Sequence, residues 1–241
     1  MVDRNKSKLI VDLFEQMRQR TQPPSGVAQS LFGDDSAGIY VYSVFMSSTQ
    51  VSTVIEQMAY GINKLDNASL IEGEVADEIS YEIENLLFRV SMVVDRCLKL
   101  INAVYDLGIP KRECKMRAVT GNHHVTNDVA DVIKRLESIT RPAKTARNDV
   151  AHHESWDDSK LMYVRAADVF SSTSDGAPDE MLERLRPFTG PIAKSFVREK
   201  VGQFEALRKQ IDEQVFELYN ALSTVFSVEL SKRDSIDKTD N

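Results

Sequence analysis

Apolar residues recur every three or four positions over residues 71–107, and this spacing constrains the fold more than any other feature of the sequence. It is the spacing of one face of an α-helix. A helix of this length would span roughly 55 Å, so we expect a bend or break near Gly73. Gly108 and Pro110 follow the last apolar positions and are typical of a helix end.

Three further segments repeat this pattern and predict helices. They cover residues 8–20, residues 39–66 and a final stripe over residues 196–230. Residues 39–45 are rich in β-branched and aromatic side chains, which favour strands. The periodic continuation to residue 66 nevertheless favours one helix, weakened locally by Gly61.

Proline and glycine divide the second half of the chain. A helix capped at Thr126 or Asn127 meets Pro142, which predicts a kink or a new helix start. Beyond it, the sequence predicts a short apolar segment (161–170), a flexible loop (171–178), one or two helical turns (179–185) and a last helix that starts near residues 188–191. We therefore expect one all-α domain, 1–241: an up-down helical bundle with an additional N-terminal helical segment, a long C-terminal helix and a flexible charged tail at 232–241.

The net charge of −7 argues against a broad electrostatic grip on duplex DNA, which needs many basic contacts. The densest basic cluster lies in a polar connector: Lys111, Arg112, Lys115 and Arg117. It is a candidate RNA-contacting segment, or an ordinary solvated loop. On the long helix that precedes this connector, Asp95 and Lys99 have the i,i+4 spacing of a favourable ion pair.

The sequence carries no Gly-rich phosphate-binding loop, no apolar run of membrane-spanning length and no readable signal peptide. A cytoplasmic protein without a membrane segment or cofactor is the expectation. Cys97 and Cys114 show no metal-ligand spacing, and His123 and His124 lack an obvious third ligand. We therefore expect no metal site.

The chemically richest stretch is residues 145–154, which hold Arg147, Asn148, His152 and a second histidine. Histidine suits proton transfer near neutral pH, and the planar, always charged guanidinium of arginine suits a crowded phosphate. On a helix, Asn148 and His152 share one face. Arg147 and His152 lie about 140° apart around the axis, so they converge only if Arg147 sits at a frayed helix start or if its long side chain wraps round.

This stretch resembles the Arg-polar-x3-His motif of the HEPN superfamily, which contains small helical domains that cut RNA without a metal and others that are non-catalytic partners. The resemblance implies a HEPN-like core over about 39–231 and an endoribonuclease acting as a homodimer, with an antitoxin partner or in a phage-defence setting. It implies that Arg147 stabilises the transition state, Asn148 orients and His152 transfers protons. Further candidates that would support these residues are Asp149, His153 and Glu154.

The alternative is a non-catalytic helical interaction module or accessory subunit. The final helix is apolar enough to dock against a partner protein as well as to form a core. In that reading Arg147 simply pairs with Asp149 or Glu154. The aromatic positions that carry this alternative are Phe196, Phe204, Phe216, Tyr219 and Phe226.

Overall fold

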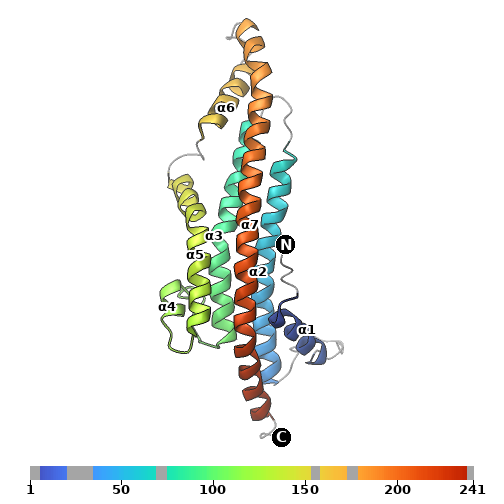
Figure 1. The fold of residues 1–241 in the computed structure, drawn as a ribbon, viewed down its shortest axis with the longest axis vertical. Coiled ribbons are helices and arrows are strands. Elements are labelled where there is room, and N and C mark those ends of the chain that lie inside the picture. The colour runs from blue at the N-terminus through green and yellow to red at the C-terminus, as the bar shows by residue number, and fades with distance from the viewer. Residues whose placement is uncertain (1–5, 21–34, 69–74, 153–157, 173–178, 238–241) are drawn as a thin grey trace. The chain divides into compact units, whose positions relative to one another are not determined.

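The computed structural model describes residues 6–20, 35–68, 75–152, 158–172 and 179–237. All regular structure in these ranges is helical, which confirms the predicted all-α class. Figure 1 shows the seven helices, which are α1 (Lys8–Arg20), α2 (Ser36–Asp66), α3 (Val75–Val104), α4 (Met116–Thr120), α5 (Asn127–His152), α6 (Ser159–Ser172) and α7 (Asp179–Asp237).

The chain divides into two compact units, and four of the helices contribute a segment to each. Unit 1 comprises Met1–Val54, Met92–Thr140 and Gln210–Asn241. Unit 2 comprises Ile55–Ser91 and Arg141–Lys209. Whether the whole chain is one domain, as the sequence suggested, stays a prediction.

In unit 1, segments of α2, α3, α5 and α7 pack side by side around an apolar core. The hydroxyl of Tyr40 on α2 donates to the carbonyl of Val104, at the end of α3, over 2.7 Å. The ring of Tyr40 also stacks on Phe226 of α7, with centroids 5.7 Å apart. Tyr219 is fully buried and donates to the carbonyl of Ser48 over 3.3 Å. Buried tyrosines whose hydroxyls reach a partner fix the helices laterally without an unsatisfied polar group.

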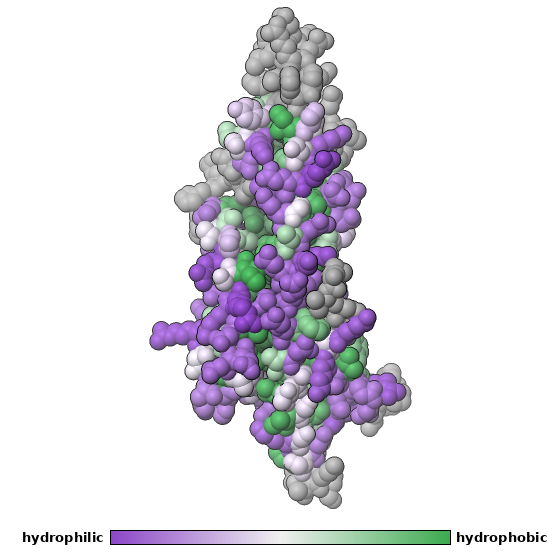
Figure 2. All heavy atoms as spheres, in the orientation of Figure 1, coloured by the Kyte–Doolittle hydropathy of each residue, from purple (hydrophilic) through white to green (hydrophobic). Residues whose placement is uncertain are grey.

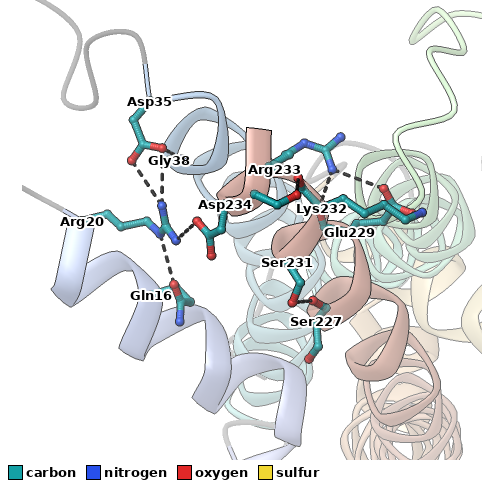
Figure 3. A network of polar contacts seen from close by, with 11 residues as sticks. Gln16, Arg20, Asp35, Gly38, Ser227, Glu229, Ser231, Lys232, Arg233 and Asp234 are labelled. Carbon is teal, nitrogen blue, oxygen red and sulfur yellow. Dashed lines mark hydrogen bonds and ion pairs between the residues drawn. The ribbon is translucent and has the colours of Figure 1, made fainter. Parts of the chain in front are cut away.

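The N-terminal helix α1 is tied to unit 1 by apolar and ionic contacts. Its residues Leu9, Ile10 and Leu13 are buried. Arg20, its last residue, lies between two carboxylates (Figure 3), with 3.3 Å to Asp35 and 2.5 Å to Asp234. An Asp35 oxygen also accepts from the backbone N–H of Gly38 at 2.8 Å, which caps the start of α2.

The end of α7 differs from the prediction. We expected a flexible tail at 232–241, but the helix continues to Asp237 and residues 238–241 lie outside the described ranges. Arg233 explains part of the difference, because it pairs with Asp106 at 2.6 Å and with Glu229 at 3.3 Å. Burial alone would raise the pKa of Glu229, but hydrogen bonds from Lys232 and Arg233 outweigh it and hold that pKa below its ordinary value. These interactions order charged residues that sequence pattern alone assigns to a tail.

In unit 2, a close glycine contact and two ion pairs hold the helices together. Gly61 of α2 faces Leu86 of α3 so closely that a Cβ at this position would lie 2.9 Å from a Leu86 methyl group. The glycine that weakens the helix by propensity therefore permits close packing. Arg165 of α6 pairs with Asp77 at 3.1 Å, and Lys160 pairs with Glu199 of α7 at 2.6 Å.

The predicted new helix starts at Pro142 and near Pro191 are wrong. Helix α5 runs through Pro142, and α7 runs through Pro191 without a new start. Both prolines are exposed, as is Ser138, whose carbonyl loses its helical donor to Pro142. That carbonyl lies on the solvent side, where water can replace the missing hydrogen bond. The short helix α4 was not predicted, because five residues are too few to show periodicity.

On the face drawn in Figure 2, hydrophilic residues form most of the described surface, with small hydrophobic patches between them. Among the described helices, none is both long enough and apolar enough to cross a lipid bilayer.

Candidate functional site

Helix α5 carries the Arg-polar-x3-His motif in its last two turns. The helix is continuous from Asn127 to His152, so Arg147 lies inside it and not at a frayed start. The first route by which Arg147 and His152 were expected to converge is therefore wrong. Asn148 and His152 lie four residues apart in one helix, which places both on one face as predicted.

The guanidinium of Arg147 is held by two neutral groups in unit 2. Its Nη1 donates to Oδ1 of Asn148 over 3.1 Å. Its Cζ lies 5.5 Å from the centre of the Phe88 ring, within cation–π range. Arg147 is half-buried, Asn148 is exposed and Phe88 is 40% exposed. The arginine is thus oriented while its charge stays open to solvent.

Phe88 was not foreseen from the sequence. It lies on α3, far from the motif along the chain, and it stands outside the predicted apolar stripe. A large aromatic residue on the polar face of an amphipathic helix was the available signal. The side chain of Phe88 places a flat, partly exposed ring next to Arg147.

The alternative ion pair of Arg147 with Asp149 is not seen. Asp149 is exposed, and in the described ranges no carboxylate forms an ion pair with Arg147. Glu154 and His153 lie outside the described residues. For His152 the described structure gives the backbone, as the last residue of α5, and not the side chain.

The basic connector lies in unit 1. Lys111 and Arg112 are in the turn after α3, Lys115 is the N-cap residue of α4, and Arg117 is on α4. All four side chains are exposed. Arg147 belongs to unit 2, so the role of the connector in the same site stays a prediction.

Within the described residues there is no group of three or more potential metal-ligating side chains. The ring centroids of His123 and His124 lie 3.9 Å apart, with the two rings tilted by 40°. Cys97 and Cys114 are free thiols and both are buried. Burial raises the pKa of the Cys114 thiol, and nearby Lys99 partly opposes this rise.

Comparison with known proteins gives one match. The family model described as Cthe2314-like HEPN matches residues 39–172, which is more than half of the chain and runs from the start of α2 to the end of α6. No curated protein and no solved structure matches. The matched region contains the motif on α5 and Phe88 on α3, and leaves out α1 and α7. The chain belongs to the HEPN superfamily, in its Cthe2314-like family.

Proposed function

We propose that this chain is a metal-independent endoribonuclease of the HEPN type. The observation that carries the proposal is the state of Arg147, which is oriented by Asn148 and Phe88 and forms no ion pair within the described residues. A guanidinium held in this way is prepared for an external phosphate, because its planar fork donates to two oxygens.

The proposed reaction uses the RNA's own 2′-hydroxyl. A histidine base takes the 2′-OH proton, and O2′ attacks phosphorus. The bond to O5′ breaks, and an acid protonates the leaving oxygen. The products are a 2′,3′-cyclic phosphate and a 5′-hydroxyl. His152 carries the proton transfers, Asn148 orients it, and Arg147 stabilises the charge on the phosphorane.

We propose a homodimer as the active form. Arg147 and His152 lie five positions apart on a continuous helix, about 140° around its axis. A second protomer with its own α5 alongside would bring the arginine of one chain to the histidine of the other. Lys111, Arg112, Lys115 and Arg117 are proposed RNA contacts, and an antitoxin or phage-defence setting is part of the same proposal.

The non-catalytic alternative loses its main argument. Four of the five aromatic residues that suggested a docking face on α7 are buried within the chain: Phe196, Phe204, Tyr219 and Phe226. They form core and offer no apolar face to a partner.

The test is cleavage of a mixed single-stranded RNA in EDTA. We expect the wild-type protein to cut it and to leave 2′,3′-cyclic phosphate ends. The His152→Ala protein, purified in the same way, controls for contaminating ribonuclease. Activity that EDTA abolishes, or products with 3′-hydroxyl ends, would contradict the proposal.

Phe88 is proposed as a positioning residue for Arg147. A cation–π contact at an exposed site is worth about 0.5–1 kcal/mol, so Phe88→Ala is expected to lower kcat/KM about 2–5-fold. Phe88→Tyr keeps the ring and should restore activity. Phe14 of unit 1 is 59% exposed, and Phe14→Ala serves as the matched control with unchanged kcat/KM. Equal activity of Phe88→Ala and wild type would remove Phe88 from the site.

A further inference from the structure

An apolar surface is exposed in unit 1 where α1 contacts the first half of α2. Val11 and Phe14 lie three residues apart on α1 and are 54% and 59% exposed. The ring of Phe14 meets the half-buried ring of Phe45 on α2 edge to face, with centroids 5.7 Å apart. This contact joins the apolar residues of the two helices into one continuous surface.

The surface continues along α2. Ile39, Tyr42 and Met46 lie at helical spacing on one side of this helix and are 54%, 38% and 40% exposed. We call the surface that they form with Phe45 and with the two exposed residues of α1 the α1–α2 face. Exposed apolar residues are ordinary when they are scattered, but a contiguous set of this size marks an interaction site.

Positive charge lies along the α3 edge of the α1–α2 face. Arg96 and Lys99 lie three residues apart on α3 and border the same open hollow as Tyr42 and Met46. Nη1 of Arg96 donates to Oε1 of Gln50 over 2.9 Å. This neutral partner on α2 holds the guanidinium beside the apolar residues and leaves its charge in place.

The two cations are not neutralised within the described ranges, where no ion pair includes Arg96 or Lys99. The Asp95–Lys99 pair predicted from spacing is therefore not seen there. Asp106 borders the same hollow, but it already pairs with Arg233 at 2.6 Å. Because the chain has a net charge of −7, its surface as a whole repels acidic partners while this edge attracts them.

The opposite edge, on α1, carries no comparable excess of charge. Glu15 pairs with Arg18 at 2.9 Å, and the hydrogen bond from Arg18 holds the pKa of Glu15 below its ordinary value. Lys8 and Asp12 on the same helix have opposite signs. The α1–α2 face is therefore apolar in the middle, positive along one edge and balanced along the other, which distinguishes the two sides of a partner.

This pattern is complementary to an amphipathic helix that carries acidic residues on one side of its apolar stripe. Helices that dock on apolar surfaces place their anchors at i, i+3, i+4 and i+7. Aromatic, methionine and arginine side chains, such as Phe14, Met46 and Arg96, are enriched in the surfaces that receive protein partners. An anionic lipid surface fits less well, because the net charge of −7 opposes approach to it.

We propose that the α1–α2 face binds an amphipathic helix of a partner protein, with its apolar stripe on Phe14, Tyr42 and Met46 and its carboxylates on Arg96 and Lys99. The family match leaves out α1, so this face combines a helix of the matched region with a helix outside it. The face lies in unit 1 and the α5 motif in unit 2. The proposal does not depend on the ribonuclease proposal.

The test uses the full chain and two labelled synthetic helices, with binding followed by fluorescence anisotropy. Both peptides carry leucine at the i, i+3, i+4 and i+7 positions. One has glutamate along one side of this stripe, and the other has lysine there. We expect the glutamate peptide to bind the wild-type protein at least about tenfold more tightly, because like charges placed against each other are strongly unfavourable. Binding of neither peptide, or equal binding of both, would overturn the proposal.

The apolar part of the face is tested by the Tyr42→Ala/Met46→Ala protein. We expect it to bind the glutamate peptide at least about tenfold more weakly, because a few central anchors carry most of the affinity of an interface. The matched control is Tyr60→Ala/Met162→Ala, which removes the same side chains from positions that are 64% and 56% exposed in unit 2. It should bind as the wild type does, and equal binding by the two variants would contradict the proposal.

The charged edge is tested by reversing its sign. The Arg96→Glu/Lys99→Glu protein should bind the lysine peptide more tightly than the glutamate peptide, a reversal that a loss of structure cannot produce. Lys194→Glu/Arg198→Glu makes the same change at exposed positions outside the face and should keep the wild-type preference. Tighter binding of single-stranded RNA or of phosphatidylserine vesicles than of the glutamate peptide, lost in the double alanine variant of the face, would replace the partner helix by that ligand.

Discussion

The His152→Ala protein is expected to cleave RNA at least about 100-fold more slowly than the wild type, because general acid–base catalysis contributes about 10²–10⁴ to a rate. His152 is the last residue of α5, and alanine is a good helix former at such a position. The stability should therefore change little. Initial rates on a labelled single-stranded RNA, with thermal unfolding measured in parallel, give both quantities.

A matched control separates this effect from a general loss of histidine. His123 is exposed in a turn of unit 1, and His123→Ala should retain full activity.

Mixing two inactive proteins, His152→Ala and Arg147→Ala, tests the dimer. A mixed dimer regains one arginine–histidine pair across its interface, so activity should return. Full activity of His152→Ala alone would end the proposal, and no recovery on mixing would end its dimeric form.

The Phe226→Ala protein is expected to lose about 3–5 kcal/mol of unfolding free energy, the usual cost of deleting a large core aromatic side chain. Phe226 is 1% exposed and stacks on Tyr40 with an interplanar angle of 18°. Truncation removes apolar contacts and leaves a cavity beside a tyrosine whose hydroxyl bonds to α3. Urea unfolding followed by circular dichroism measures the loss.

The control for this prediction is Phe226→Leu, which keeps most of the volume and should cost less than about 1.5 kcal/mol. A second comparison uses Val228 on the same helix, which is 50% exposed. Val228→Ala should leave the midpoint nearly unchanged. If Phe226→Ala were no less stable than Val228→Ala, the α2–α7 contact would not be part of the core.

The long helices were predictable because their apolar residues repeat at the helical period. Residues 39–45 show why period outweighs composition: their β-branched residues favour a strand, yet Tyr40, Val41 and Val44 fall on one buried helix face. Apolar burial along one stripe stabilises the helix more than local propensity weakens it. The all-α class and the register of Asn148 with His152 followed from such periodicity, whereas the family was indicated by the resemblance of the Arg147–His152 motif.

Other features depend on information that the local pattern lacks. Pro142 reads as a break, and only its exposure in the folded chain makes the missing hydrogen bond tolerable. The contact between Arg147 and Phe88 joins two helices, so neither residue's neighbours along the chain reveal it. The turn after α3 likewise takes its geometry from two hydrogen bonds between the side-chain amide of Asn102 and the backbone of Ile109.

The two buried cysteines allow local and global opening of the native protein to be measured by thiol alkylation. The thiolate is the form that reacts with an alkylating reagent. Each buried thiol is therefore alkylated only when its surroundings open to solvent. Cys97 lies on α3 and is fully buried. Its labelling therefore requires the helical bundle of unit 1 to come apart. Cys114 lies in the turn before α4, close to Lys99, and its labelling requires only that this connector lifts. The ratio of the two labelling rates thus separates local from global fluctuation without any engineered probe.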